Sequence, residues 1–148
     1  MAMFNSFNIS ASGMTAQRFR SDIISQNVAN ATTTRTSDGE AYRRKIVTFS
    51  EKTSAPFSHV LAKANGNYAS GSGVKVSTVT EDYETEMKMT YDPSHPDADE
   101  NGYVTYPNVN IVTEMTNLID ASRSYEANVT AFDASKTIAM KGLQVGEN

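Results

Sequence analysis

The chain has 148 residues, of which 39% are hydrophobic, and it carries a formal net charge of −4. This length allows one domain with a modest core, and the acidic balance disfavours binding to nucleic acid or to an anionic membrane. Because the sequence contains no cysteine, disulfides, thiol chemistry and cysteine-bound zinc are excluded.

The first segment with a clear pattern is an N-terminal helix expected over residues 4–30, where apolar residues recur at helical spacing. Its main apolar stripe consists of Phe7, Ala11, Met14, Ile24 and Val28. The start of the sequence lacks the charged and apolar regions of a secretory signal peptide, so we expect no signal cleavage. No apolar run approaches the length of a membrane-spanning helix.

The middle of the chain is rich in Thr, Ser, Asn and Gly and predicts a small β-region. Short runs of alternating pattern at 44–49, 74–80 and 87–91 indicate three or four strands. The basic run 43–45 is interpreted as a charged strand edge that resists aggregation rather than as a phosphate site. Residues 51–72 have weak periodicity and predict a mobile loop.

Residues 97–108, DADENGYVTYPN, begin like a calcium-binding helix-loop-helix motif. The twelfth position of that motif requires a bidentate acid, but here it is Asn108, preceded by Pro107. Two prolines in the preceding segment also prevent an entering helix. We therefore interpret the stretch as a loop, with Asn101-Gly102 as a hairpin turn.

His95 lies near Asp92, Asp97 and Asp99, which raises the alternative of a metal site. A lone histidine among loop acids is more often simply solvated, and a metal site needs ligands held by an ordered second shell. No catalytic motif with a recognised mechanism occurs. We expect no metal, no cofactor and no catalytic residue.

The clearest element is a C-terminal helix expected over residues 108–143, with a heptad pattern of apolar residues. Asn108 or Asn110 would cap its start, and Gly142 or Gly146 would end it. Its apolar positions are Ile111, Met115, Leu118, Tyr125, Val129, Phe132, Ala139 and Leu143, with polar breaks at Ser122 and Lys136.

These elements predict an α+β fold in which long N- and C-terminal helices form a coiled-coil-like pair. A small antiparallel β-region and loops lie between them. The expected organisation is an N-terminal helix at 1–31, a β-rich middle at 32–107 and a C-terminal helix at 108–148, with the two helices forming one helical domain. The apolar positions of both helices are the expected assembly seam.

Three segments resemble the axial proteins of the bacterial flagellum, most closely the rod proteins of the FlgC type. Residues 25–45 are similar to the N-x-A-N-x-x-T signature of that family. Residues 91–115 and 122–132 resemble a segment of the FlgC type and the C-terminal axial helix. Thr32 and Ser21 depart from the common pattern. The signature positions are Asn27, Val28, Ala29, Asn30 and Thr33.

This resemblance implies a structural subunit of the proximal rod in the flagellar basal body, and not an enzyme. Such subunits polymerise with other axial proteins into a tubular drive shaft that transmits motor torque. It also implies passage through the flagellar type III export apparatus without signal cleavage. The implied partners are other rod proteins, copies of the chain itself and the adaptor proteins of the membrane ring. No nucleic acid and no small-molecule substrate are expected.

Other interpretations remain open from the residues alone. The chain would alternatively be a different rod protein, or a coiled-coil adaptor or export chaperone that stays in the cytoplasm. A calcium-regulated binding module and an enzyme with an unfamiliar site are further alternatives. Asn27 and Asn30 would either bond to backbone where the helix turns into the β-region or simply mark a polar helix end.

Overall fold

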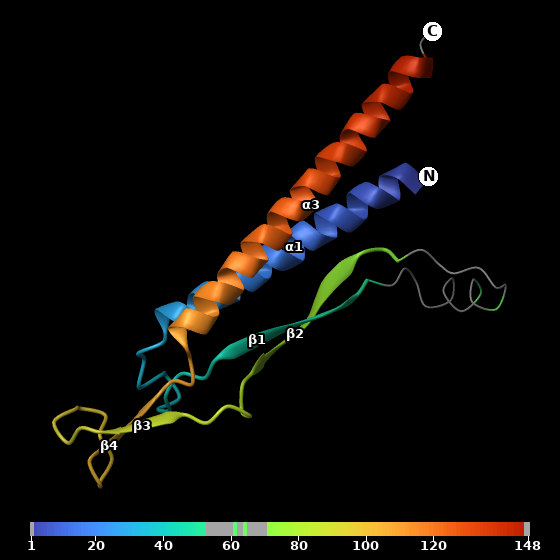
Figure 1. Cartoon of the computed structure of the whole chain (residues 1–148). Coiled ribbons are helices and arrows are strands. Elements are labelled where there is room, and N and C mark those ends of the chain that lie inside the picture. Colours follow the sequence, from blue (N-terminus) through green and yellow to red (C-terminus); the bar gives the residue numbers. More distant parts are fainter. Residues whose placement is uncertain (1, 53–60, 62–63, 65–70, 147–148) are drawn as a thin grey trace. The chain divides into compact units, whose positions relative to one another are not determined.

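The computed structural model describes residues 2–52, 61, 64 and 71–146, with side chains from residue 5 to residue 145 of those ranges (Figure 1). In chain order the elements are α1 (Ala2–Ala29), β1 (Lys45–Glu51), β2 (Val74–Glu81), β3 (Lys88–Tyr91), β4 (Tyr103–Tyr106) and α3 (Ile111–Gly146). The fold is α+β, as expected, with long helices at both ends and paired strands between them.

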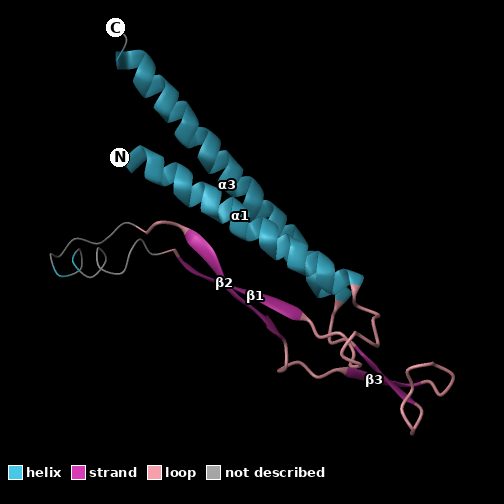
Figure 2. Ribbon diagram, turned by 180° about the vertical axis from the view of Figure 1, so that it is seen from behind, coloured by secondary structure: helices cyan, strands magenta, loops and turns pink. Residues whose placement is uncertain are grey.

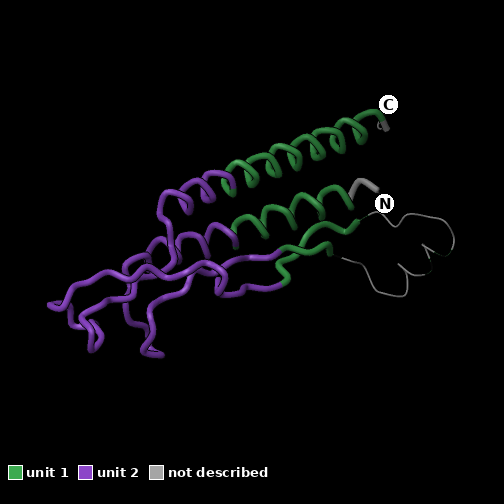
Figure 3. The backbone as a smooth tube through the Cα atoms, turned by 60° about the horizontal axis from the view of Figure 1, so that its bottom comes forward, with its two compact units in different colours: residues 1–19, 49–77, 121–148 green, residues 20–48, 78–120 purple. Residues whose placement is uncertain are grey.

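The chain divides into two compact units, shown in two colours in Figure 3. Unit 1 comprises residues 1–19, 49–77 and 121–148, and unit 2 comprises residues 20–48 and 78–120. Each unit therefore combines a part of α1, a part of α3 and part of the β-structure. The two ends of the chain meet within both units, which accounts for the helix pair predicted from the terminal apolar stripes.

In unit 1 the two helical segments lie side by side in both views of the ribbon (Figures 1 and 2). The rings of Phe7 and Phe132 meet edge to face with their centroids 5.0 Å apart. Gly13 faces Asn128 so closely that a Cβ atom on Gly13 would lie 2.5 Å from Asn128 Oδ1. A glycine at this point therefore permits the close approach of α1 and α3 in this unit.

The strands form two separate two-stranded sheets, β1–β2 and β3–β4 (Figure 2). The Lys52 N–H donates to Gly73 O (2.8 Å) and the Asp82 N–H donates to Arg44 O (2.8 Å), so β1 and β2 run antiparallel. All three predicted strands are confirmed, and β4 completes the set. Most of the predicted mobile loop, 53–60, 62–63 and 65–70, lies outside the described residues.

In unit 2, β3 and β4 pair antiparallel, with Lys88 opposite Tyr106 and Tyr91 opposite Tyr103. The turn predicted at Asn101-Gly102 is present, since the Gly102 N–H donates to Asp99 O (3.0 Å), but the whole of loop 92–102 joins the strands. Gly102 ends that loop with a φ of 81°, a value that L side chains rarely adopt. The hairpin is present, but the Asn-Gly pair is only the final bend of a longer connection.

The helix boundaries agree with the predicted capping residues at one end. Asn110 caps α3, since its Oδ1 accepts the N–H groups of Val112 (3.0 Å) and Thr113 (3.3 Å). Asn108 does not cap the helix. At the other end, α3 continues past Gly142 to Gly146.

The described core is small, and it contains as many polar as apolar side chains. The buried residues are Ala16, Ile24, Tyr42, Val104, Ala121, Ser10, Asn27, Asp82, Asn108 and Glu114. This agrees with the low hydrophobic content of the sequence. In the part of the chain that the structure describes, neither helix has the length and apolarity needed to cross a membrane.

Candidate functional site

The predicted apolar stripe of the N-terminal helix faces the interior only in part. Ile24 is buried in unit 2. Half-buried positions are Phe7, Ala11, Met14 and Val28. The polar middle of the stripe therefore does not prevent α1 from forming one continuous helix.

The predicted stripe of α3 divides into half-buried and exposed positions. The half-buried residues are Leu118, Val129, Phe132 and Ala139. The exposed residues are Ile111, Met115, Tyr125 and Leu143, with exposed fractions of 45%, 56%, 39% and 72%. A large part of the apolar stripe thus has no cover from the residues that the structure describes.

The face of α3 that lies against the rest of the chain consists mainly of small and polar residues. Glu114 and Ala121 are 1% and 0% exposed, and Asn128 contacts Gly13. These residues recur at a spacing of seven, like the predicted stripe, but are displaced around the helix from its exposed members. Among the described residues, the chain therefore contacts itself through one face of α3, and the neighbouring apolar face stays exposed.

Where α1 ends in unit 2, Asn27 joins three segments through its side-chain amide. The amide donates to Lys45 O (2.9 Å) and to Glu114 Oε2 (3.0 Å). Its oxygen accepts the Lys45 N–H (2.9 Å) and the Tyr42 hydroxyl (2.9 Å). Because both donors and the acceptor oxygen are used, Asn27 holds the start of β1 and the first turn of α3 against α1.

The other signature positions shape the chain after α1. Asn30 Nδ2 donates to Gln26 O (2.9 Å) at the helix end, and its Oδ1 accepts the Thr33 hydroxyl (3.2 Å). The Tyr42 N–H donates to Thr33 O (3.1 Å). Val28 is half-buried and Ala29 is exposed. Asn27 and Asn30 therefore both bond to backbone at the point where the helix turns towards the β-region.

Glu114 carries the charge at the centre of this arrangement. Its Oε1 accepts hydrogen bonds from Arg44 Nε (2.9 Å) and Asn117 Nδ2 (3.3 Å), and Arg44 Nη2 lies 2.9 Å away. Arg44 Nη1 also reaches Asp82 Oδ2 at 3.4 Å. The interpretation of the basic run as a charged strand edge is therefore wrong for Arg44, because two acids draw its guanidinium inward.

Asn108 completes the cluster from the segment that precedes α3. Its Oδ1 accepts the Arg44 N–H (2.9 Å), while Nδ2 donates to Asp82 O (2.9 Å) and Thr85 O (3.0 Å). We call Asn27, Tyr42, Arg44, Asp82, Asn108 and Glu114 the Asn27 junction. Its members come from five separate segments of unit 2, so it fixes how α1, β1 and α3 meet in that unit.

Two titratable groups of the Asn27 junction are perturbed by their surroundings. The Thr85 backbone N–H, together with the Thr85 hydroxyl, the Glu84 N–H and Arg44, holds the pKa of Asp82 below its usual value despite the opposing effect of burial. Burial, and then the nearby charges of Glu81 and Glu114, raise the pKa of the Tyr42 hydroxyl. Asp82 is thus held as the anion that pairs with Arg44, and Tyr42 as a neutral donor.

Sequence reasoning identified Asn27 but missed its partners. Glu114 looked like an ordinary acid in the first turn of a helix, where negative charge is favourable and exposed. Asp82 follows β2, and the hydroxyl of Thr85, three residues later, donates to Asp82 Oδ2, which accounts for the local turn. For Arg44 the available signal was its position directly before β1, in a run of basic residues that is unusual in this acidic chain.

The acidic loop after β3 is organised by turn hydrogen bonds. Asp92 Oδ1 accepts the N–H and hydroxyl of Ser94, and His95 Nδ1 accepts the Asp97 N–H (3.1 Å). Asp97 Oδ2 accepts the Thr34 hydroxyl (2.8 Å). Among the residues that the structure describes, no three acidic or histidine side chains gather in a way that would hold a metal ion.

Comparisons with known proteins agree with the arrangement of the two helical ends. Residues 7–35 match the family model "Flagella basal body rod protein", and residues 100–145 match "Flagellar basal body rod FlgEFG protein C-terminal". These matches cover the N-terminal helix with its signature and the C-terminal helix with the segment before it. The β-region between residues 35 and 100 lies outside both matches.

Relatives that match along the whole length of the chain indicate the type of rod protein more specifically. The chain is 46% identical to the flagellar basal-body rod protein FlgC of Bacillus subtilis, over 99% of this chain and all of that protein. It is 41% identical to FlgC of Borreliella burgdorferi, over 98% of both chains, and 40% identical to FlgC of Salmonella typhimurium, over 99% and 100%. The chain therefore belongs to the flagellar basal-body rod proteins of the FlgC type, and it is a structural subunit of the flagellar rod.

Proposed function

We propose that this subunit joins neighbouring rod proteins, including copies of itself, by burying the exposed apolar side of α3 against them. The observation that supports this proposal is the exposure of Ile111, Met115, Tyr125 and Leu143 while the same helix contacts its own chain through Glu114, Ala121 and Asn128. Exposed apolar side chains at regular helical spacing are typical of a surface that another helix covers. The predicted seam is thus assigned to contacts between subunits.

The Asn27 junction has a different role in this proposal. It sets the directions in which α1 and α3 leave the β-region of unit 2, because its hydrogen bonds are directional and its charges are paired. A subunit that polymerises needs its contact faces in a fixed relation, since a non-closing contact repeated many times builds a helical tube. The junction therefore supports assembly without touching a neighbour itself.

Membership of the rod family supports the remaining parts of the proposed role. We infer that the subunit occupies the proximal rod and reaches it through the flagellar type III export apparatus. There it meets the adaptor proteins between membrane ring and rod, and it contributes to the shaft that carries torque. Its role is structural and not catalytic, and it uses no cofactor.

The test of the contact face uses exposed positions, so that folding of the subunit is not at issue. Met115→Asp and Leu143→Asp each place a carboxylate on the apolar face of α3, and Ala134→Asp places one on an exposed position elsewhere around the helix. A strain that lacks the native chain is complemented with each variant. We expect poor swimming and few complete rods with Met115→Asp and Leu143→Asp, and near-normal rods with Ala134→Asp.

Electron microscopy of basal bodies from the same strain without any complementing chain tests the role itself. We expect the membrane ring to persist while rod, hook and filament are missing. Intact rods in that strain would instead favour a cytoplasmic adaptor or export chaperone. Full swimming with both aspartate variants would show that the apolar face of α3 is not the contact surface.

A further inference from the structure

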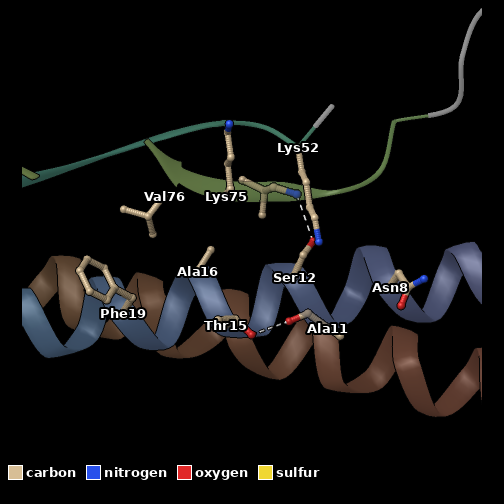
Figure 4. A pocket seen from close by; sticks show the side chains of 10 residues that line it. Asn8, Ala11, Ser12, Thr15, Ala16, Phe19, Lys52, Lys75 and Val76 are labelled. Carbon is tan, nitrogen blue, oxygen red and sulfur yellow. Dashed lines mark hydrogen bonds between the residues drawn. The ribbon is translucent and has the colours of Figure 1, made fainter. Parts of the chain in front are cut away.

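Polar side chains connect the β-structure to other segments in both units, and the two contacts differ in chemistry. In unit 1, Ser12 on α1 faces the strands (Figure 4), and its Oγ accepts the Val74 N–H (3.0 Å). A serine hydroxyl does not change its charge between about pH 5 and 8. In unit 2, the loop between β3 and β4 makes a comparable contact with the segment after α1, and that contact depends on a histidine.

His95 organises the middle of loop 92–102 through its side chain. The residue is half-buried, and its Nδ1 accepts the Asp97 N–H (3.1 Å). The imidazole ring also meets the ring of Tyr106 on β4 edge to face, with the centroids 6.4 Å apart. Because a ring nitrogen that accepts a hydrogen bond carries no proton, the neutral imidazole must bear its proton on Nε2.

Asp97 links this part of the loop to the segment that follows α1. While its N–H bonds to His95, its Oδ2 accepts the Thr34 hydroxyl (2.8 Å), and its Oδ1 lies 3.6 Å from Arg35 Nη1. The Asp97 side chain is 23% exposed, whereas that of Arg35 is 67% exposed. An exposed ion pair contributes little, so the hydrogen bond from Thr34 is the stronger part of this link.

The charges around the imidazole act on its proton in both directions. The charged and titratable groups that face it, from the loop, the two strands and the segment after α1, are Asp92, Asp97, Lys88, Tyr106 and Arg35. The two carboxylates favour a proton on the ring, and the two cations oppose it. Loss of the hydrogen bond from Asp97 also opposes protonation.

A proton taken up by His95 must bind Nδ1, since Nε2 already carries one. The new N–H then faces the Asp97 N–H, and two donors cannot bond to each other. We infer that His95 is a pH-sensitive switch for the attachment of loop 92–102. The neutral ring holds Asp97 in place to receive Thr34. The protonated ring turns towards the carboxylates of Asp92 and Asp97, and the loop separates from the segment after α1.

Amide hydrogen exchange measured by NMR on the full-length native chain tests the switch. The protection factor, which is the intrinsic exchange rate divided by the measured rate, removes the direct effect of pH on exchange. Between about pH 8 and pH 5, the protection factor of the Asp97 amide should fall about fivefold, because one hydrogen bond is lost. That of the Val74 amide, whose acceptor is Ser12, should not change. The nuclear Overhauser effect between the side chains of Thr34 and Asp97 should weaken over the same range.

His95→Asn is the matched variant, because asparagine Oδ1 takes the place of Nδ1 and accepts the Asp97 N–H at either pH. This variant retains every acid of the loop, and its Asp97 protection should be equal at both pH values. His59→Asn removes the other histidine of the sequence and should behave like the native chain. Equal Asp97 protection at both pH values in the native chain, or an equal fall in His95→Asn, overturns the switch. A Thr34–Asp97 contact that persists unchanged at the lower pH overturns the separation of the loop.

Discussion

Removal of the Glu114 carboxylate should destabilise the subunit more than any other loss of a single charge in the described residues. Glu114 is 1% exposed and accepts hydrogen bonds from Arg44 and Asn27. Glu114→Ala leaves the Arg44 guanidinium without its nearest anion and one Asn27 amide proton without an acceptor. Loss of one partner from a buried ion pair generally costs about 3–5 kcal/mol in the free energy of unfolding.

Two features of the structure place the expected loss at the lower end of that range. The Arg44 side chain is 26% exposed, so water reaches part of the guanidinium once Glu114 is gone. Arg44 also retains Asp82 at 3.4 Å. We therefore expect a loss of about 3 kcal/mol, a substantial fraction of the roughly 5–15 kcal/mol that stabilises a typical domain.

Urea unfolding followed by circular dichroism measures this loss, with Glu86→Ala as the matched control. Glu86 is an exposed acid of the same unit, so its removal should change the free energy of unfolding by less than about 0.5 kcal/mol. The double variant Arg44→Ala with Glu114→Ala should be less unstable than the sum of the single variants, with a coupling of about 1–3 kcal/mol. Equal effects of Glu114→Ala and Glu86→Ala, or additive single variants, would refute the central role of the ion pair.

Three further changes test other contacts. Gly13→Ala should cost about 1–2 kcal/mol in a thermal or urea melt because the new methyl group meets the Asn128 amide, whereas Gly142→Ala, with nothing within 4 Å, should stabilise α3 by about 0.5–1 kcal/mol. Asn110→Ala removes the cap of α3 and should cost about 1 kcal/mol in the same melt. The pKa of Asp82 is lowered from 3.8, so its carboxylate stabilises the fold above that pH and loses this contribution as the pH falls through the folded-state pKa. Asp82→Asn should therefore flatten the acid side of the stability–pH profile, and an unchanged acid limb would contradict this.

The helices and strands were predictable because they depend on local pattern. The 3-4 spacing around Ile111 and Leu118 and the alternation in residues 74–80 each report on a few neighbouring residues. The cap at Asn110 is equally local, since its side chain accepts the N–H groups of Val112 and Thr113, two and three residues later. The turn at Gly102 was predictable too, but the length of its loop was not, because an Asn-Gly pair indicates a bend and not how many residues precede it.

The Asn27 junction was not predictable from the chain because its partners are far apart in sequence. Asn27 lies 87 residues from Glu114, and Arg44 lies 70 residues from it. A glutamate in a first helical turn is normally exposed, and only the presence of Arg44 and Asn27 makes its burial favourable. The spacing of residues along the sequence carries no information on contacts between such distant positions. The family signature did indicate one of the partners, Asn27.

The apolar pattern of α3 does not distinguish contacts within the chain from an exposed surface, and its role as an assembly seam stays a prediction. Residues at Glu114, Ala121 and Asn128 and those at Ile111, Met115 and Tyr125 both recur at helical spacing, but only the second set is apolar enough to be recognised. The apolar pattern therefore included both exposed positions and half-buried ones such as Phe132, and it did not indicate the small and polar residues that also make contacts within the chain.

The small buried core and the exposed apolar residues of α3 have an energetic consequence for a subunit that must polymerise. Only five apolar side chains are buried among the described residues, two of them alanines, while Ile111, Met115 and Leu143 are exposed. Full burial of a large apolar side chain contributes about 1.5–3 kcal/mol, and these three are 45%, 56% and 72% exposed, so covering them would add about 3–5 kcal/mol. A chain stabilised mainly by a polar junction can hold its contact faces in place and still gain much of its stability on joining the rod. Free subunits should accordingly unfold at lower urea concentration than subunits within isolated basal bodies, and equal midpoints would show that assembly does not complete the fold.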